Sequence, residues 1–238
     1  MPSNLELAVI SEDIYHDKSK LGGVWKRKTG TIFKESSGFF WGEYVNEQTK
    51  KKVVAFRGTE PSDWSDIVAD VHIVLKKSNI QFIKALQQGS AYGSNAVYTG
   101  HSLGGALAKF VAASLGYQAI AFNAPGIKGL NNLTAMHKNA KIHNINAVFD
   151  PVSKYGDGFG TVETVHVGSI PLIPDTAEPI AVGASVFATR GLAATAVGGY
   201  YLVGQHSISN LVVELQSREN LTAANMPYYN LPRVQATS

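Results

Sequence analysis

The chain has 238 residues, 45% hydrophobic and 16% charged, and a formal net charge of +3, which excludes a disordered polypeptide and suits one globular α/β domain. Cysteine is absent, so a disulfide framework and a thiolate metal site are excluded. The basic residues form small clusters without interleaved aromatic residues, and we therefore expect no nucleic acid partner.

The predicted elements alternate between helices and strands. Ser3 followed by Glu6 is a capping box that predicts a helix through Tyr15. The further expected helices begin near residue 62 and cover 78–88, 103–115 and 208–216. The expected strands cover 39–45, 52–57, 96–98, 119–123, 142–149 and 162–167. This alternation predicts an α/β fold with a mostly parallel sheet and helices on both faces, in a single domain over residues 1–238.

The most informative motif is Gly100-His101-Ser102-Leu103-Gly104, which lies between an apolar strand and a helix-forming run. A serine between two glycines, where a strand turns directly into a helix, is the pattern of a nucleophile elbow. We expect a strained serine backbone, and we expect that a Cβ at either glycine would collide with a neighbouring element. The motif predicts Ser102 as a nucleophile.

A serine nucleophile needs a histidine base that is oriented by an acid. In enzymes with such an elbow, the acid and then the histidine follow the serine, on loops at the carboxyl ends of later strands. His206 fits as the base because it lies in a predicted loop just before the last helix. The other histidines after the serine lie in polar sequence or in predicted strands: His137, His143 and His166.

Three carboxylates compete for the role of the acid. Asp150 ends a predicted strand and precedes a proline that fixes the turn, so it is the favoured candidate. Asp157 lies in a glycine-rich stretch that is more simply a turn, and Asp175 lies in a proline-flanked loop.

An oxyanion hole needs two hydrogen-bond donors. We expect one to be the backbone N–H of Leu103, directly after the nucleophile, and the second to come from a loop after an earlier strand. Thr59 is the candidate for the second donor because Gly58 lets its backbone approach. Arg57 is expected to support this loop through carbonyl groups or a carboxylate such as Asp66.

Two groups of residues together resemble the class 3 lipases, the fungal-type lipase-like α/β-hydrolases. They are Val54-Ala55-Phe56-Arg57-Gly58-Thr59 with Asp63-Trp64 and Asp66, and Thr99-Gly100-His101-Ser102-Leu103-Gly104-Gly105-Ala106-Leu107-Ala108. The segments 7–15 and 150–152 are also similar to that family, so the match runs from about residue 5 to residue 215. The resemblance implies an α/β-hydrolase fold, a carboxylic ester substrate that is commonly a lipid, a triad of Ser102, Asp150 and His206, and Thr59 in the oxyanion hole.

The expected function is therefore that of a serine carboxylic ester hydrolase, a lipase or phospholipase A-type enzyme that forms an acyl-enzyme and needs no cofactor or metal. Two alternatives stay open. One is a thioesterase or acyltransferase with the same triad, and the other is a non-catalytic binding module with the same fold. The sequence predicts no oligomeric state.

Residues 177–204 are rich in alanine, glycine and valine, with only Glu178 and Arg190 as charges. They form either a packed helical hairpin or loop, or an acyl-chain wall or mobile cap with transient contact to a lipid surface. The compact stretch between Thr59 and the elbow argues against a long lid helix there. The tail from residue 218 to 238 is expected to be irregular.

The start of the chain has neither the basic region nor the apolar core of a secretory signal, and no run approaches the roughly 20 apolar residues of a membrane span. We therefore expect a cytoplasmic protein, one exported by a non-Sec route, or a mature form that has lost its leader.

Overall fold

The strands form one seven-stranded sheet whose spatial order follows the chain from β1 to β7. The computed structural model describes residues 1–28, 38–59, 75, 79–167 and 205–218. Neighbouring strands pair antiparallel from β1 to β3 and parallel from β3 to β7. The strands are β1 (Trp25–Arg27), β2 (Trp41–Asn46), β3 (Lys52–Phe56), β4 (Ala96–His101), β5 (Gln118–Phe122), β6 (Lys141–Ala147) and β7 (Thr161–Val165). The predicted mostly parallel sheet is confirmed.

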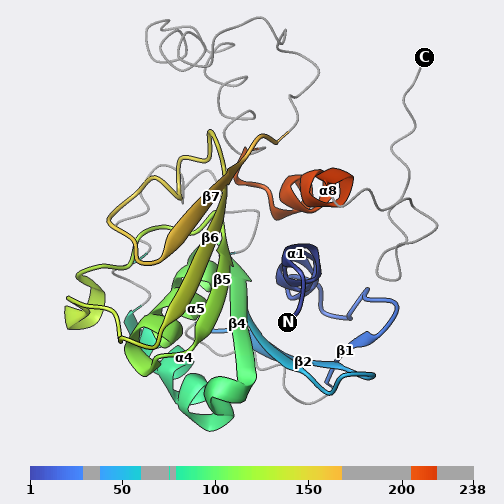
Figure 1. The fold of residues 1–238 in the computed structure, drawn as a ribbon, viewed down its shortest axis with the longest axis horizontal. Helices are drawn as coiled ribbons and strands as arrows, with labels where there is room; N and C mark the ends of the chain where they lie inside the picture. Colours follow the sequence, from blue (N-terminus) through green and yellow to red (C-terminus); the bar gives the residue numbers. More distant parts are fainter. Residues whose placement is uncertain (29–37, 60–74, 76–78, 168–204, 219–238) are drawn as a thin grey trace, which may run out of the picture.

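Helices cover both faces of the sheet, as predicted (Figure 1). The helices α1 (Asn4–Asp13) and α8 (Ile208–Arg218) lie side by side on one face. The other face carries α4 (Asn79–Tyr92) and α5 (Leu103–Leu115), which also pack against each other. In the part of the chain that the structure describes, two short 3₁₀ helices, η2 (Gly93–Asn95) and η3 (Leu130–Asn132), lie in connections.

Local sequence explains where the principal helices begin and end. Ser3 Oγ accepts from the backbone N–H of Glu6, and the Glu6 carboxylate accepts from the N–H of Ser3, so α1 begins with the predicted capping box. Helix α5 ends at Gly116, whose left-handed φ of 81° suits glycine. Most of α5 is buried because it packs on β4 and β5 and beneath α4.

The alternation of side chains along the strands produces two cores, one on each face. Val54 and Phe56 of β3 point to the α4/α5 face, whereas Val53 and Ala55 point to the α1/α8 face. The first core contains Tyr98, Leu107, Phe110 and Val111, and the second contains Leu7, Ile10, Phe122 and Leu211. The sheet is therefore buried from both sides, which fixes the position of its carboxyl edge.

Several expectations need correction. The helix expected over 78–88 extends to Tyr92, and the strand expected over 162–167 ends at Val165. Strand β1 was not predicted, because it has three residues, two of them charged, and therefore no apolar pattern. The strand expected over 142–149 ends at Ala147, because pairing with β7 ends there. The helix expected near residue 62, the segment 177–204, and the tail beyond Arg218 lie outside the described residues.

Among the helices within the described ranges, none combines the length and the apolar composition that crossing a membrane requires.

Lys109 is a fully buried cation on α5. Its Nζ donates to the carbonyl oxygens of Ala124 (3.1 Å) and Pro125 (2.7 Å), in the turn that follows β5. Burial lowers the pKa of Lys109 from 10.5 to about 7. A neutral amine keeps two N–H groups, which is enough to donate to both carbonyls. The contact can therefore persist when the charge is lost.

The Lys109 amine makes stability rise with pH, in the same direction as a salt-bridged carboxylate but in a more alkaline pH range. Between about pH 7 and 10.5 the unfolded chain binds more protons at this lysine, so its contribution to stability rises with pH. We expect the free energy of unfolding of the wild type, relative to Lys109→Met, to rise by roughly 2–4 kcal/mol from about pH 7 to about pH 10. Denaturant titrations measure this difference. The exposed Lys128→Met controls for the lost charge, and an equal pH response in both variants would contradict the prediction.

Candidate active site at the carboxyl edge of the sheet

Ser102 occupies a sharp turn between β4 and α5 and has φ 57° and ψ −127°, a backbone conformation that L-residues rarely adopt. Its N–H donates to the carbonyl of Phe122 on β5 (3.0 Å). A Cβ on Gly100 would lie 2.5–2.6 Å from the backbone of Gly104 and of Phe56, and a Cβ on Gly104 would collide with the Phe56 carbonyl. The geometry is that of a nucleophile elbow, and the expected reason for both glycines is confirmed.

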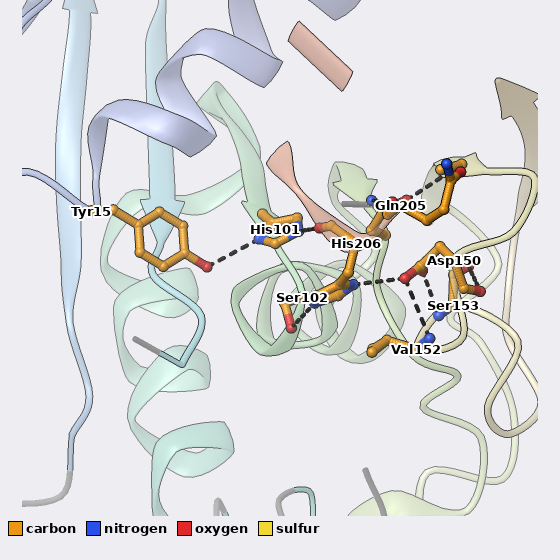
Figure 2. A network of polar contacts seen from close by, with 10 residues as sticks. Tyr15, His101, Ser102, Asp150, Val152, Ser153, Gln205 and His206 are labelled. Atoms are coloured by element: carbon orange, nitrogen blue, oxygen red, sulfur yellow. Dashed lines mark hydrogen bonds and ion pairs between the residues drawn. The ribbon is translucent and has the colours of Figure 1, made fainter. Parts of the chain in front are cut away.

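The structure brings Ser102, His206 and Asp150 into one hydrogen-bonded chain (Figure 2). His206 Nδ1 lies 2.7 Å from Asp150 Oδ1, and His206 Nε2 lies 2.9 Å from Ser102 Oγ. Since the carboxylate can only accept, Nδ1 carries the proton and Nε2 presents its lone pair to the serine hydroxyl. All three side chains are 0% exposed, so these polar contacts act in a low-dielectric environment.

The Asp150 carboxylate is fixed by the turn that carries it. The backbone N–H of Asp150 donates to the carbonyl of Ala147 (3.1 Å), and this hydrogen bond closes a turn just beyond β6. The backbone N–H groups of Val152 and Ser153 donate to Oδ1 (3.3 Å) and Oδ2 (2.7 Å) respectively. Donors to both oxygens hold the plane of the carboxylate.

The loop after β3 lies directly against the elbow. A Cβ on Gly58 would lie 2.6 Å from the carbonyl oxygen of His101 and 3.2 Å from Ser102 Cβ, so only glycine permits this approach. Arg57 N–H donates to the carbonyl of Phe40 (2.9 Å), and the guanidinium carbon lies 4.3 Å from the centre of the Phe40 ring. Thr59 follows immediately. Asp66, expected to contact Arg57, lies outside the described residues.

Leu103 is the first residue of α5, and the first N–H groups of a helix have no acceptor within that helix. The helix dipole adds partial positive charge at this end. An oxygen atom that becomes negative next to Ser102 Oγ would therefore lie in a favourable electrostatic environment.

Within the described residues, the alternative histidines and the carboxylate of Asp157 do not join this chain. His143 contacts Thr161 and Glu163 on the neighbouring strand β7, His137 accepts from Asn139 N–H, and His166 is exposed. Asp157 is exposed in the glycine-rich turn where it was expected, and Asp175 lies outside the described residues. His206 itself lies in a helical turn separated from α8 by Ser207, not in a loop.

Sequence reasoning missed two buried residues around His206. His101 Nε2 donates to the carbonyl of His206 (2.6 Å), and Asn123 Nδ2 donates to the carbonyl of Gln205 (3.0 Å). His101 ends β4 and Asn123 directly follows β5, and a polar residue at the carboxyl end of a strand was the available signal. Within the described ranges, no three His, Asp or Glu side chains gather in a way that could hold a metal ion.

The chain is 28% identical over 190 residues to the extracellular phospholipase A1 of Serratia liquefaciens. The match covers 71% of this chain and 56% of the relative, so the chain spans little more than half of that protein. Among solved structures, the Rhizomucor miehei lipase–propeptide complex has a TM-score of 0.48 at 16% identity, with 67% and 66% of the two chains covered. The Yarrowia lipolytica Lip2 lipase has a TM-score of 0.47 at 14% identity, with 70% and 79% covered.

A family model described as phospholipase-like, a Tle-like phospholipase domain, matches residues 6–205. The match includes the elbow, the turn that carries Asp150 and the loop after β3, and it ends one residue before His206. It confirms the lipase-type resemblance predicted from the motifs, together with the α/β-hydrolase fold. The chain belongs to the phospholipase-like family with a Tle-like phospholipase domain.

Proposed function

We propose that this protein is a serine carboxylic ester hydrolase of the lipase and phospholipase A type, which cleaves acyl esters of lipids through a Ser102–His206–Asp150 triad. The single observation that carries the proposal is the continuous hydrogen-bonded chain from Ser102 Oγ through His206 to Asp150, at 2.9 Å and 2.7 Å, on a strained elbow. A surface serine in a glycine-rich turn would require none of these contacts.

The proposed reaction has two halves. His206 Nε2 removes the proton from Ser102 Oγ as the oxygen attacks the ester carbonyl, and Asp150 stabilises the resulting imidazolium through Nδ1–H. The imidazolium then protonates the departing alcohol, which leaves an acyl-enzyme. In the second half, His206 deprotonates a water molecule that attacks the acyl-enzyme, and the proton returns to Ser102 when the fatty acid leaves.

The oxyanion of each tetrahedral intermediate is proposed to accept from the N–H of Leu103 and from Thr59. The first assignment is supported by the position of Leu103 at the start of α5. The second is supported by the contact between the Gly58 backbone and the elbow, which brings the following residue to the same edge of the sheet. Each such donor typically contributes about 3–4 kcal/mol of transition-state stabilisation.

The substrate class rests on the family and on the name of the Serratia relative, a phospholipase A1. Acyl esters of glycerol, in phospholipids or neutral glycerides, are the substrates that this kinship supports. We also propose transient contact with a lipid surface, because such substrates are presented in bilayers or droplets.

The first test removes only the nucleophilic oxygen. Ser102→Ala should lower turnover by about 10⁴-fold or more while thermal unfolding stays close to that of the wild type. Fatty acid released from phospholipid vesicles and from emulsified glycerides measures the loss. Ser11→Ala is the matched control, because Ser11 Oγ is equally buried, 3.0 Å from Thr99 Oγ1, and outside the triad. If Ser102→Ala kept most of the activity, Ser102 would have no part in the reaction.

The second test concerns the acid. Asp150→Asn preserves the shape of the side chain but presents an amide that cannot replace the carboxylate at both His206 Nδ1–H and the N–H groups of the turn. We expect kcat to fall by about 10⁴-fold, because the imidazole loses its orientation and its compensating charge. Asp157→Asn, at the exposed competitor, should leave kcat within about two-fold of the wild type. The reverse ranking of the two variants would transfer the role to Asp157.

A further inference from the structure

Two consecutive backbone carbonyls at the histidine of the site are each bound by a buried side chain. The carbonyl of Gln205 accepts from Asn123 Nδ2 at 3.0 Å, and the carbonyl of His206 accepts from His101 Nε2 at 2.6 Å. Both donor side chains are fully buried. The proposed reaction uses neither of them, so they need a separate explanation.

The His101 ring is held in one tautomer. Because the His206 carbonyl can only accept, Nε2 carries the proton, and Tyr15 Oη then donates to Nδ1 (3.1 Å, Figure 2). Burial and the neighbouring His206 ring lower the pKa of His101 well below its ordinary value, which keeps the ring neutral. The centres of the two imidazole rings lie 4.7 Å apart.

Asn123 is held equally firmly at the end of β5. Its Oδ1 accepts from the N–H of Ala147 on β6 (2.7 Å), and its own N–H donates to the carbonyl of Ile145 (3.1 Å). Its φ of 45° is left-handed, a conformation that asparagine tolerates better than most residues. The turn that begins at Ala124 is bound by the buried Lys109 amine described above.

Tyr15 is fixed through the end of α1. Asp13, fully buried, accepts from Tyr44 Oη (3.0 Å) and from Lys20 N–H (2.6 Å), and the Arg27 guanidinium lies 3.7 Å away. These contacts join the last turn of α1 to β1 and β2. The Tyr15 hydroxyl therefore approaches His101 from a rigid part of the fold.

We propose that His101 and Asn123 form a carbonyl clamp, a pair of positioning residues that sets the distance between the base and the nucleophile. The inference rests on the proposed function and deepens it. His101 is the covalent neighbour of Ser102, so the residue that binds the backbone of the base is joined directly to the residue that carries the nucleophilic oxygen. The carboxyl end of β4 therefore positions both partners of the 2.9 Å contact between His206 Nε2 and Ser102 Oγ.

The second donor is necessary because one hydrogen bond leaves the peptide free to rotate about it. His101 at the end of β4 and Asn123 after β5 bind the carbonyls of two successive residues. The backbone on either side of the His206 Cα therefore has a defined orientation. Asp150 then selects the ring orientation through Nδ1. A reacting group displaced by about 1 Å can cost about 100-fold in rate, so such positioning has a kinetic signature.

The experiment compares kcat, KM and thermal stability of the whole wild-type chain with those of clamp variants and matched controls. His101→Leu and Asn123→Asp each remove a buried donor. His101→Gln keeps an N–H near the Nε2 position, whereas His101→Asn reaches only the Nδ1 position and serves if the leucine variant does not fold. Tyr98→Phe is the control for His101, because Tyr98 lies on the same strand as His101 and its hydroxyl contacts two backbone carbonyls, those of Gly89 and Gly93.

Asn144→Asp is the control for Asn123→Asp, because Asn144 Nδ2 also donates to two backbone carbonyls, those of Phe159 and Thr161, and is almost as buried. We expect the clamp variants other than His101→Gln to lower kcat about 10- to 100-fold with KM within about two-fold, and His101→Gln to recover most of kcat. The controls should lose comparable thermal stability and keep kcat. Hydrogen–deuterium exchange of the peptide over 205–218 should accelerate only in the clamp variants.

Clamp variants that lose thermal stability but retain wild-type kcat and unchanged exchange over 205–218 would overturn the proposal and leave the two side chains a purely structural role. Equal loss of kcat in the controls would also overturn it. Failure of the proposed function looks different: the wild type would then release no more fatty acid than Ser102→Ala. In that case the exchange measurement alone still decides whether His101 and Asn123 fix the backbone at residue 206.

Discussion

The hydrogen bond between His206 Nε2 and Ser102 Oγ is the contact on which the proposed chemistry of this site depends, and it joins residues 104 positions apart. Three features make it possible. The elbow holds the serine in a backbone conformation that costs about 1–3 kcal/mol, which the packing of α5 on β4 and β5 offsets. The turn after β6 fixes the carboxylate that orients the ring. The ends of β4 and β5 bind the backbone of the histidine.

Much of the fold could be predicted because local chemistry and burial agree. The capping box of Ser3 and Glu6 and the left-handed Gly116 mark ends of α1 and α5, and the predicted bounds of α5 match the observed ones. The apolar runs of β3 and β5 lie in the centre of the sheet, where both faces are buried. Strand β1 escaped prediction because Trp25-Lys26-Arg27 is short and lies at the sheet edge, where pairing with β2 decides its conformation.

The site was predictable where a residue type and its position in the chain were jointly informative. Ser102 between two glycines, Asp150 before a proline and His206 before the last helix each met such a condition, and the structure places the three in contact. His101 and Asn123 could not be predicted in this way. The residues that they contact lie 105 and 82 positions away, and the contacts depend on the register of β4 and β5. Tyr15 could not be linked to them without the packing of α1 on the sheet.

The most direct measurement of the central claim, that His206 activates the Ser102 hydroxyl, is peptide mapping by mass spectrometry after reaction with a fluorophosphonate. Such probes modify a serine only when a neighbouring base makes its oxygen nucleophilic. The account predicts one adduct, on the peptide that contains Ser102, and its loss in a folded His206→Ala variant. An adduct on another residue, or ester hydrolysis that persists while Ser102 stays unmodified, would contradict it.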